Sequence, residues 1–454
     1  MRQKMLERLD ALAKTAAEKI KSFDFARVFS HHDADGITAA GIICLSLLRK
    51  KIPFQATFLS KLDEEAVKDI EGNVNVIFCD MGSGQTKLLS HLKSAVIVDH
   101  HKPVVENAGH LQVNPHLAGI DGAFELSASG TAYAIARQID SANIDLSGLA
   151  IAGIVGDKQQ MIGANREVLE EALRKGVVSI KRDFLYAYCG GTETCTLGEI
   201  LEYNFEPYLE ITGDAQKIEE FLKKIKLKPQ TSYSDLNEEE KRRFLSAVML
   251  KAMKRSSAEA LAELIGEAYL LNKEVYPQAL GFANLLNACG KLGKTGLALS
   301  LCLRDKTQLE EAKKYYHEYQ RRVIAELKAI EGKVKQLKAI QYVQIKDAAV
   351  TSSVSSCIMR YISPELPLLV LSEEAGKIKV SARGSRKLVE NGLDLGAALR
   401  IAAERAQGTG GGHSIASGAS IPKGMENIFI QAVEEIVAKQ LKIEVKIEEK
   451  KVKT

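Results

Sequence analysis

Histidine and aspartate side chains, which bind metal ions and transfer protons, gather in a few short motifs of this 454-residue chain. Five of the nine histidines fall in three motifs: His31, His32, His100, His101 and His413. The first motif reads SHHDADG over residues 30–36. Alternate residues of an extended turn share a face, so His31, Asp33 and Asp35 can point at one region. The plainer alternative is a polar loop that caps the next helix, with Asp35 near its N-terminus.

Three further motifs place acidic or imidazole side chains directly after apolar runs. Asp80 follows VNVIFC, Asp99-His100-His101 follows AVIV, and Asp157 follows LAIAGIVG. Taken singly, Asp80 is most simply a turn or cap residue, the histidine pair a solvated loop, and Asp157 indicates almost nothing. An aspartate before two histidines can, however, orient an imidazole through a hydrogen bond.

Together, the four motifs supply a mixed set of oxygen and nitrogen ligands. Carboxylates with imidazoles suit manganese or magnesium, and the motifs lack the thiolates of structural zinc sites. The set is large enough for two ions that share one carboxylate. Two ions about 3.5–4 Å apart can stabilise both the attacking and the leaving oxygen of a phosphoryl transfer. The motifs therefore predict a two-metal centre for phosphate-ester chemistry.

The elements that must position these motifs have the pattern of a parallel α/β sheet. Short apolar runs at 26–30, 74–79 and 95–98 are typical of strands, and the apolar segment 37–48 is typical of a helix. Strands that alternate with helices predict a parallel sheet. Ligands of such sheets bind beyond the carboxyl ends of the strands, and three strands deliver Asp or His to that end.

A second, smaller α/β unit is predicted near the C-terminus. Its strands are LPLLVLS and KIKVSARG, joined by a turn at 374–376, and the helix LDLGAALRIAAERA follows. Between the two units the chain reads as mostly helical, with a charged, irregular stretch at 205–245 and a helix over 309–330. We expect a catalytic domain at 1–190, a mainly helical insert at 191–303, a linker helix at 304–336, a substrate-binding domain at 337–440 and a C-terminal tail at 441–454.

The C-terminal unit carries a motif that could bind substrate. Three glycines after its helix let a phosphate or a base approach the backbone amides closely, and an adjacent histidine can add a hydrogen bond. Two arginines in SARGSR are candidates for phosphate contacts. The alternative is a flexible loop. The predicted substrate-binding residues are Arg383, Arg386, Gly410, Gly411, Gly412 and His413.

Composition excludes several classes of protein. A content of 46% hydrophobic and 26% charged residues is typical of a soluble globular protein. No apolar stretch approaches the ~20 residues that a membrane span needs, and the charged N-terminus lacks the apolar core of a signal peptide. We therefore expect a cytoplasmic protein without a membrane partner. The net charge of +4 does not by itself indicate nucleic-acid binding, because acidic metal ligands can offset a basic channel.

The four motifs, in this order, resemble those of the DHH superfamily of phosphoesterases: SHHDADG, CDMG, VDHH and GIVGD. The run GTGGGH resembles the signature of the DHH-associated C-terminal domain. The resemblance covers roughly residues 25–160 and 340–422. The stretch LLNACGKLGKTGLALSL at 285–301 resembles one in archaeal RecJ-like exonucleases, including those that bind the replication factor GINS.

This resemblance implies a role for each motif residue. One ion would be held by His31, Asp33 and Asp80. The other would be held by Asp35, Asp80, His100 and Asp157, with Asp80 as the bridging ligand. Asp99 would orient the neighbouring side chains without binding an ion itself, and His101 would contact the scissile phosphate. His32 lacks the His-x-Asp-x-Asp spacing of His31 and is expected to point elsewhere. Two divalent ions are implied, with Mn²⁺ favoured and Mg²⁺ as the alternative.

The activity that the resemblance implies is exonucleolytic hydrolysis of single-stranded DNA or RNA in DNA replication or repair, with water activated by two metal ions. A close alternative is a phosphodiesterase of oligoribonucleotides or cyclic dinucleotides, because the same catalytic motifs serve both. The large insert and the long linker favour the replication or repair type. A pyrophosphatase has similar metal motifs, but the glycine–histidine motif and the context of Arg383 argue against it.

An alternative of another class is a replisome scaffold that binds GINS without catalysis, like the eukaryotic helicase accessory factor related to RecJ. Such proteins lose metal ligands, whereas every ligand position is filled here. The insert is far longer than a connection between two lobes needs. We expect it either to bind a protein partner, with GINS as the first candidate, or to add a helical layer to the catalytic sheet. Catalysis and GINS binding can coexist.

Overall fold

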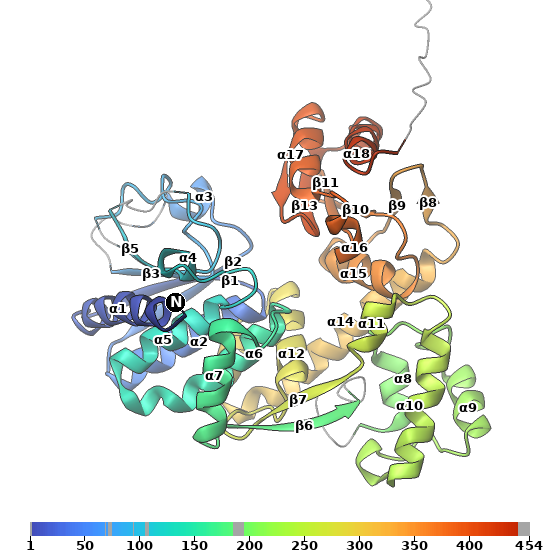
Figure 1. The fold of residues 1–454 in the computed structure, drawn as a ribbon, viewed down its shortest axis with the longest axis horizontal. Helices are drawn as coiled ribbons and strands as arrows, with labels where there is room; N and C mark the ends of the chain where they lie inside the picture. The colour runs from blue at the N-terminus through green and yellow to red at the C-terminus, as the bar shows by residue number, and fades with distance from the viewer. Residues whose placement is uncertain are drawn as a thin grey trace, which may run out of the picture. The chain divides into compact units, whose positions relative to one another are not determined.

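The computed structural model describes residues 2–68, 70, 75–93, 95–104, 109–184 and 195–443. The chain forms two compact units, each built from separate stretches of sequence (Figure 1). The first unit comprises Met1–Glu193 and Gly266–His317, and the second comprises Thr194–Ile265 and Glu318–Thr454. The segment expected to form one insert, 191–303, is thus shared between the two units. The domain boundaries expected from the sequence stay a prediction.

A five-stranded parallel sheet forms the core of the first unit, with the strand order β2-β1-β3-β4-β5. Its strands are β1 (Ala26–His31), β2 (Phe54–Leu59), β3 (Val76–Cys79), β4 (Ala95–Val98) and β5 (Leu111–Val113). Every residue of β3 and β4 is buried, as in strands that are covered on both faces. The predicted α/β fold with a parallel sheet is confirmed.

Helices pack on this sheet and on one another. They are α1 (Arg2–Lys21), α2 (Ala34–Arg49), α3 (Glu64–Val67), α4 (Pro115–Ala118), α5 (Ala128–Ile139), α6 (Ser147–Gly156), α7 (Gly163–Arg174), α12 (Ala279–Lys291) and α13 (Thr295–Cys302). The apolar helix α2 is buried along most of its length because α5, α6, α12 and α13 all pack against it. Small residues allow this close packing: a Cβ on Gly41 would lie only 2.5 Å from the Cβ of Cys302.

Two features of the middle of the chain differ from expectation. A two-stranded sheet joins β6 (Val178–Phe184) to β7 (Ile265–Leu271), whose sequences are too far apart for a local pattern to predict the pairing. The expectation of an irregular stretch at 205–245 was wrong. This stretch contains α9 (Ala215–Lys224) and most of α10 (Glu238–Ala252). Both helices begin at side-chain N-caps, Asp214 and Asn237, whose polarity is typical of loops as well.

The second unit contains a six-stranded sheet with the order β12-β13-β11-β10-β9-β8. Its strands are β8 (Lys335–Gln336), β9 (Gln341–Gln344), β10 (Leu368–Glu374), β11 (Lys377–Arg383), β12 (Thr409–Gly412) and β13 (Ala416–Pro422). Its pairs are antiparallel except β9 with β10. The predicted hairpin turn is confirmed: Ala375 and Gly376 have φ of +49° and +76°, as a two-residue turn between twisted strands requires.

The remaining helices are α8 (Leu197–Tyr203), α11 (Ala258–Ala262), α14 (Leu309–Ala329), α15 (Thr351–Tyr361), α16 (Arg386–Glu390), α17 (Leu395–Arg405) and α18 (Glu426–Gln440). The predicted helix over 309–330 corresponds to α14, which begins in the first unit. The C-terminal tail beyond Ile443 lies outside the described residues. None of the helices in the described part of the chain has the length and apolar character that crossing a bilayer requires.

Candidate metal centre

The carboxyl ends of three adjacent strands bring the motifs together at one edge of the first sheet. In the register of the sheet, Cys79 of β3 lies opposite Ser30 of β1 and Val98 of β4. The residues that follow these positions are therefore neighbours: His31, Asp80 and Asp99. Sheet topology thus delivers motifs that are far apart in sequence to a single place, as the strand–helix pattern predicted.

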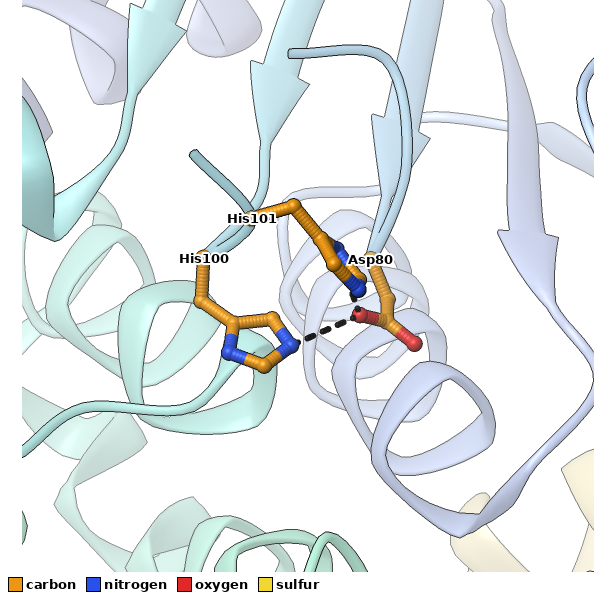
Figure 2. Close-up of side chains that lie close together, drawn as sticks. All are labelled: Asp80, His100 and His101. Atoms are coloured by element: carbon orange, nitrogen blue, oxygen red, sulfur yellow. Dashed lines mark ion pairs between the residues drawn. The ribbon is translucent and has the colours of Figure 1, made fainter. Parts of the chain in front are cut away.

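Asp80 lies at the centre of this edge, buried and with a left-handed backbone φ of +57°. Its Oδ2 is 3.4 Å from Nδ1 of His31. Its Oδ1 is 3.3 Å from Nε2 of His100 and 3.7 Å from Nδ1 of His101, as Figure 2 shows. One carboxylate therefore faces imidazoles from two different motifs, which is the position that a bridging ligand must occupy.

The orientation of His100 indicates that a cation belongs beside it. Its Nδ1 lies 2.7 Å from the carbonyl oxygen of Gly122, and a carbonyl only accepts, so Nδ1 carries a proton. When His100 is neutral, the lone pair of Nε2 faces Oδ1 of Asp80, a buried atom without a hydrogen-bond donor among the described residues. Burial opposes the charged form of His100, yet the carboxylates of Asp80 and Asp157 raise its pKa well above the usual value, so a positive charge is favoured at this place. Two electron donors at this distance repel unless a proton or a metal ion lies between them, so the pair fits a metal site.

Three groups of potential ligand atoms lie around this position. Within each group, all the atoms lie within 4.8 Å of one another. The groups are Asp80 with His100 and His101, His31 with Asp33 and Asp80, and Asp35 with His100 and Asp157. The structure therefore brings together all six residues predicted to bind metal. The second group coincides with the set expected around one ion. The third, joined to Asp80 through His100, coincides with the set expected around the other, and the division between two ions stays a prediction.

The two carboxylates of the first motif belong to candidate ligand groups and also accept hydrogen bonds at helix N-termini. Asp33 is the N-cap of α2 and accepts a hydrogen bond from the amide of Gly36 at 3.0 Å. Asp35 instead lies at the N-terminal end of α5, accepting from the Ser127 hydroxyl at 2.8 Å and from the amides of Ala128 and Ser129 at 2.8 and 3.0 Å. The capping alternative and the ligand prediction are thus compatible, because capping fixes where these carboxylates point.

Asp99 holds His101 in place without joining any of the three ligand groups found among the described residues. Its buried carboxylate accepts from Nδ1 of His101 at 2.8 Å and from the amides of Ser83, His100 and His101. Nδ1 of His101 is therefore the donor, and the side chain is 45% exposed. The expected roles of both residues in catalysis stay a prediction.

A further layer of polar contacts around Asp157 was not predicted from the sequence. Gln159 donates to Oδ2 of Asp157 at 3.0 Å and to the carbonyl oxygen of Gly122 at 2.8 Å, the same oxygen that orients His100. Asn165 in turn donates to Oε1 of Gln159 at 2.8 Å. These buried amides fix two metal-ligand positions, but nothing in their local sequence distinguishes them from other polar residues.

The electrostatics of the cluster indicate a deficit of positive charge. Burial, with the nearby charge of Asp80, raises the pKa of Asp35. Burial, aided by Asp35 and Asp80, raises the pKa of Asp157 to about 8. Burial opposes the charged form of His31, yet Asp33 raises the pKa of this imidazole well above its usual value. A bound divalent cation would stabilise the ionised form of these carboxylates in place of the protons, so the donor set fits such ions.

His32 points away from the ligands, as expected, and belongs to none of the three groups in the described part of the chain. Its Nδ1 lies 3.2 Å from the carbonyl oxygen of Leu59, and its Nε2 lies 3.4 Å from Nζ of Lys291. Burial and the charge of Lys291 lower the pKa of His32 to about 4, so this imidazole is neutral at physiological pH.

The two candidate arginines of the second unit differ in their partners. Arg383, at the end of β11, donates to Oγ of Ser356 at 3.2 Å and to the carbonyl oxygen of Ala382 at 2.9 Å. None of the ion pairs found among the described residues involves Arg383, and burial lowers its pKa to about 10. Arg386, by contrast, pairs with Glu259 at 3.0 Å. Arg386 thus has a carboxylate partner, whereas Arg383 has none among the described residues.

The glycine run forms an edge strand, β12, in place of the loop that was the alternative. A Cβ on Gly410 would lie 2.8 Å from the carbonyl oxygen of Leu399, so this position must be small for packing. Gly411 and Gly412 have φ of +155° and +140°, and a Cβ on Gly411 would meet open space. His413 follows in an exposed turn. Contact of these residues with substrate stays a prediction.

Three family models match successive parts of the chain. They describe a DHH family N-terminal domain at residues 26–154, a DHH-CID domain at residues 189–265 and a DHHA1 domain at residues 338–439. An uncharacterized protein from Methanocaldococcus jannaschii is 33% identical over 450 residues, which cover 96% of this chain and 99% of that protein.

Several solved structures have a similar fold. RecJ from Thermus thermophilus, in complex with Mn²⁺, has a TM-score of 0.61 at 18% identity and is matched over 95% of this chain and 55% of its own. This chain thus spans about half the length of that RecJ. CDC45 from Entamoeba histolytica has a TM-score of 0.63 at 14% identity and is matched over 96% of this chain and 99% of its own. From these matches and the motif geometry, the chain belongs to the DHH superfamily of phosphoesterases and has a RecJ-like fold.

Proposed function

We propose that this protein is a metal-dependent exonuclease that hydrolyses phosphodiester bonds in single-stranded DNA or RNA. The observation that carries the proposal is the set of three ligand groups at the carboxyl edge of the sheet, in which Asp80 joins the first to the second and His100 joins the first to the third. A mixed carboxylate and imidazole set suits two-metal hydrolysis of phosphate esters. Solved structures of the RecJ fold that contain Mn²⁺ or Mg²⁺ support the choice of metal, with Mn²⁺ favoured.

The residues of the centre would bind two metal ions. One ion would lie among His31, Asp33 and Asp80, and the other among Asp35, Asp80, His100 and Asp157. When bound, the ions would supply positive charge at the scissile phosphate and acidify the attacking water. The chain itself holds the ligands at fixed angles, because α2, α5 and the Gly122 carbonyl oxygen each orient one of them.

His101 would contact the scissile phosphate from the more open side of the centre. Asp99 accepts a hydrogen bond from Nδ1, which fixes the ring and stabilises its protonated form. A protonated His101 can donate from Nε2 to a phosphate oxygen, where negative charge increases during hydrolysis. Asp99 therefore acts through His101 and does not touch the reacting atoms.

The second unit would bind the nucleic-acid strand. Arg383 offers a guanidinium without a carboxylate partner among the described residues, and guanidinium groups bind phosphates through paired hydrogen bonds. Gly411 presents open space at the edge of the sheet, beside the exposed His413. Arg386 contributes less to this proposal, because Glu259 already neutralises its charge.

The test of this function is digestion of end-labelled single strands in the presence of Mn²⁺, with double strands, dinucleotides and cyclic dinucleotides as competing substrates. Stepwise shortening of long single strands is the expected result, and EDTA should stop it. Turnover confined to dinucleotides or cyclic dinucleotides would instead support the short-substrate phosphodiesterase. The position of the label in the first products would give the direction of digestion.

A second candidate function is binding to a replication complex such as GINS, and the fold shared with CDC45 is the observation that favours it. The residues concerned would be those of the predicted insert, which carries none of the metal-ligand groups found in the described residues. The Asp80→Ala protein should therefore still retain GINS in a pull-down from source-cell extract. Failure of the intact protein to retain GINS would exclude this partner, and retention by a folded protein in which the insert 191–303 is replaced by a short linker would exclude this placement.

A further inference from the structure

The second histidine of the first motif has no part in the metal centre, yet its surroundings are well defined. Nδ1 of His32 lies 3.2 Å from the carbonyl oxygen of Leu59, and a carbonyl can only accept, so Nδ1 is the donor. Nε2 lies 3.4 Å from Nζ of Lys291. An ammonium has only donors, so a neutral His32 with its lone pair on Nε2 is the form that this contact requires. His32 is thus the acceptor that orients the Lys291 side chain.

The helix that carries Lys291 is fixed on the first motif by two further contacts. Oδ1 of Asn287, one helical turn before Lys291 on the same face of α12, accepts from the amide of Ala34 at 2.8 Å. Gly290 lies so close that an added Cβ would be 1.8 Å from the carbonyl oxygen of His32. Only glycine permits this approach, so the last turn of α12 has one position relative to the motif.

This arrangement places a positive charge beside the metal ligands. Lys291 is close enough to Asp33 for its charge to stabilise that carboxylate. The Asp33 and His31 side chains are 32% and 28% exposed, so this part of the centre is accessible to a ligand. Lysine ammonium groups bind phosphates as point charges, and a substrate of the proposed exonuclease has a phosphate at every nucleotide.

We propose that Lys291 binds a backbone phosphate of the nucleic-acid strand next to the scissile one, and that His32 is the positioning residue that aims its ammonium there. The inference rests on the proposed function and adds to it a binding residue that is far in sequence from the four metal motifs but close to the first of them in space. It also gives a role to His32.

The test measures binding of a fluorescein-labelled single strand by anisotropy in EDTA, over a series of KCl concentrations, so that no metal-dependent step contributes. Lys291→Met should weaken binding roughly 5- to 10-fold at low salt. It should also lower the magnitude of the slope of log K against log [KCl] by about 0.7, the value for one phosphate contact to a single strand. Lys291→Arg should restore most of the affinity. Lys294→Met is the matched control, because it removes the same charge from an ammonium that lies over the ring of Tyr315.

His32 is tested by a double-mutant cycle. His32→Leu should weaken binding in the wild-type background but have no further effect in Lys291→Met, whereas His32→Gln, whose amide oxygen can accept, should bind like wild type. Additive losses would show that His32 does not act through Lys291, and an unchanged salt slope in a folded Lys291→Met protein would overturn the phosphate contact. Wild-type protein that neither binds nor cleaves single strands would overturn the proposed function as well, which separates that failure from the failure of this inference alone.

Discussion

Single residues at the metal centre show both what the sequence reveals and where it stops. The types and spacing of His31, Asp33, Asp80 and their partners predicted the ligand set, because these motifs directly follow strands of the parallel sheet. Gln159 and Asn165 could not be predicted, since their partners lie on other segments and an isolated amide has no diagnostic spacing. The sequence therefore identifies the candidate ligands better than the residues that orient them.

Asp99 provides a prediction at this scale. Asp99→Asn removes the charge that stabilises a protonated His101 but keeps the size of the side chain. Initial rates of hydrolysis of bis(p-nitrophenyl) phosphate with saturating Mn²⁺ should fall roughly 10- to 100-fold in kcat, the usual effect of losing a residue that orients a functional imidazole. Mn²⁺ affinity should change little, because Asp99 belongs to no ligand group among the described residues. Asp63→Asn, at the N-cap of α3, is the control, and an Asp99→Asn enzyme as fast as this control would exclude the role.

Packing of α12 on the first motif gives a prediction at the scale of elements. Gly290→Ala places a Cβ 1.8 Å from the carbonyl oxygen of His32, so the helix must move or the motif must distort. Chemical unfolding should show a loss of more than about 2 kcal/mol in the free energy of unfolding, together with weakened Mn²⁺ binding. Gly296→Ala, on α13 and facing open space, should leave stability unchanged or slightly higher. Equal stabilities for the two variants would show that α12 does not pack tightly on the motif.

Glu434 on α18 provides a second prediction at this scale. Its buried carboxylate accepts hydrogen bonds from three successive amides, those of Lys338, Ala339 and Ile340, at 2.9 to 3.1 Å. Glu434→Gln replaces one acceptor by a donor that faces these amides, which should cost about 1–3 kcal/mol of unfolding free energy. Glu435→Gln is the control, since it breaks only a surface pair with Arg405. Similar urea midpoints for both variants would show that the bonds from Glu434 to the segment between β8 and β9 do not stabilise the protein.

The same scale shows how far elements could be predicted. The strands β1, β3 and β4 and the helix α2 were predicted because apolar runs and turn residues alternate there, whereas β2 and β5 were not predicted. The pairing of β6 with β7 was missed because their partners are decided by long-range contacts. The sequence predicted an irregular stretch where α9 and α10 lie, because charged residues dominate both helices and their N-caps, Asp214 and Asn237, are residue types that are also common in loops.

At the scale of the whole molecule, the division into two units differs from the consecutive domains that the sequence predicted. After residues of the second unit, the chain returns to the first at Gly266, and α12 from this returning segment supplies Lys291 beside the first motif. A division into consecutive domains cannot express this, because units built from separate stretches are defined only by contacts between distant segments. The two-unit organisation nevertheless agrees with the predicted combination of a parallel-sheet domain and a smaller α/β domain.

Metal binding should therefore stabilise one unit and not the other. All three ligand groups belong to the first unit, so Mn²⁺ at about 100 times its Kd should stabilise that unit by about 2.7 kcal/mol, while the second unit is unaffected. Scanning calorimetry with Mn²⁺ and with EDTA should show a shift in only one of the unfolding transitions. An equal shift of the whole profile in the Asp80→Asn variant would mean that Mn²⁺ stabilises the protein at some other site.

The most direct measurement of the central claim is electron paramagnetic resonance during titration with Mn²⁺, because two ions that share a carboxylate are magnetically coupled and isolated ions are not. The wild-type protein should take up two ions per chain and give the signal of a coupled pair. Asp80→Asn, which keeps the size of the side chain and tolerates the left-handed backbone, should lose the coupled signal, and Asp63→Asn should retain it. A wild-type protein that binds a single ion, or a coupled signal that survives in Asp80→Asn, would contradict a two-metal centre bridged by Asp80.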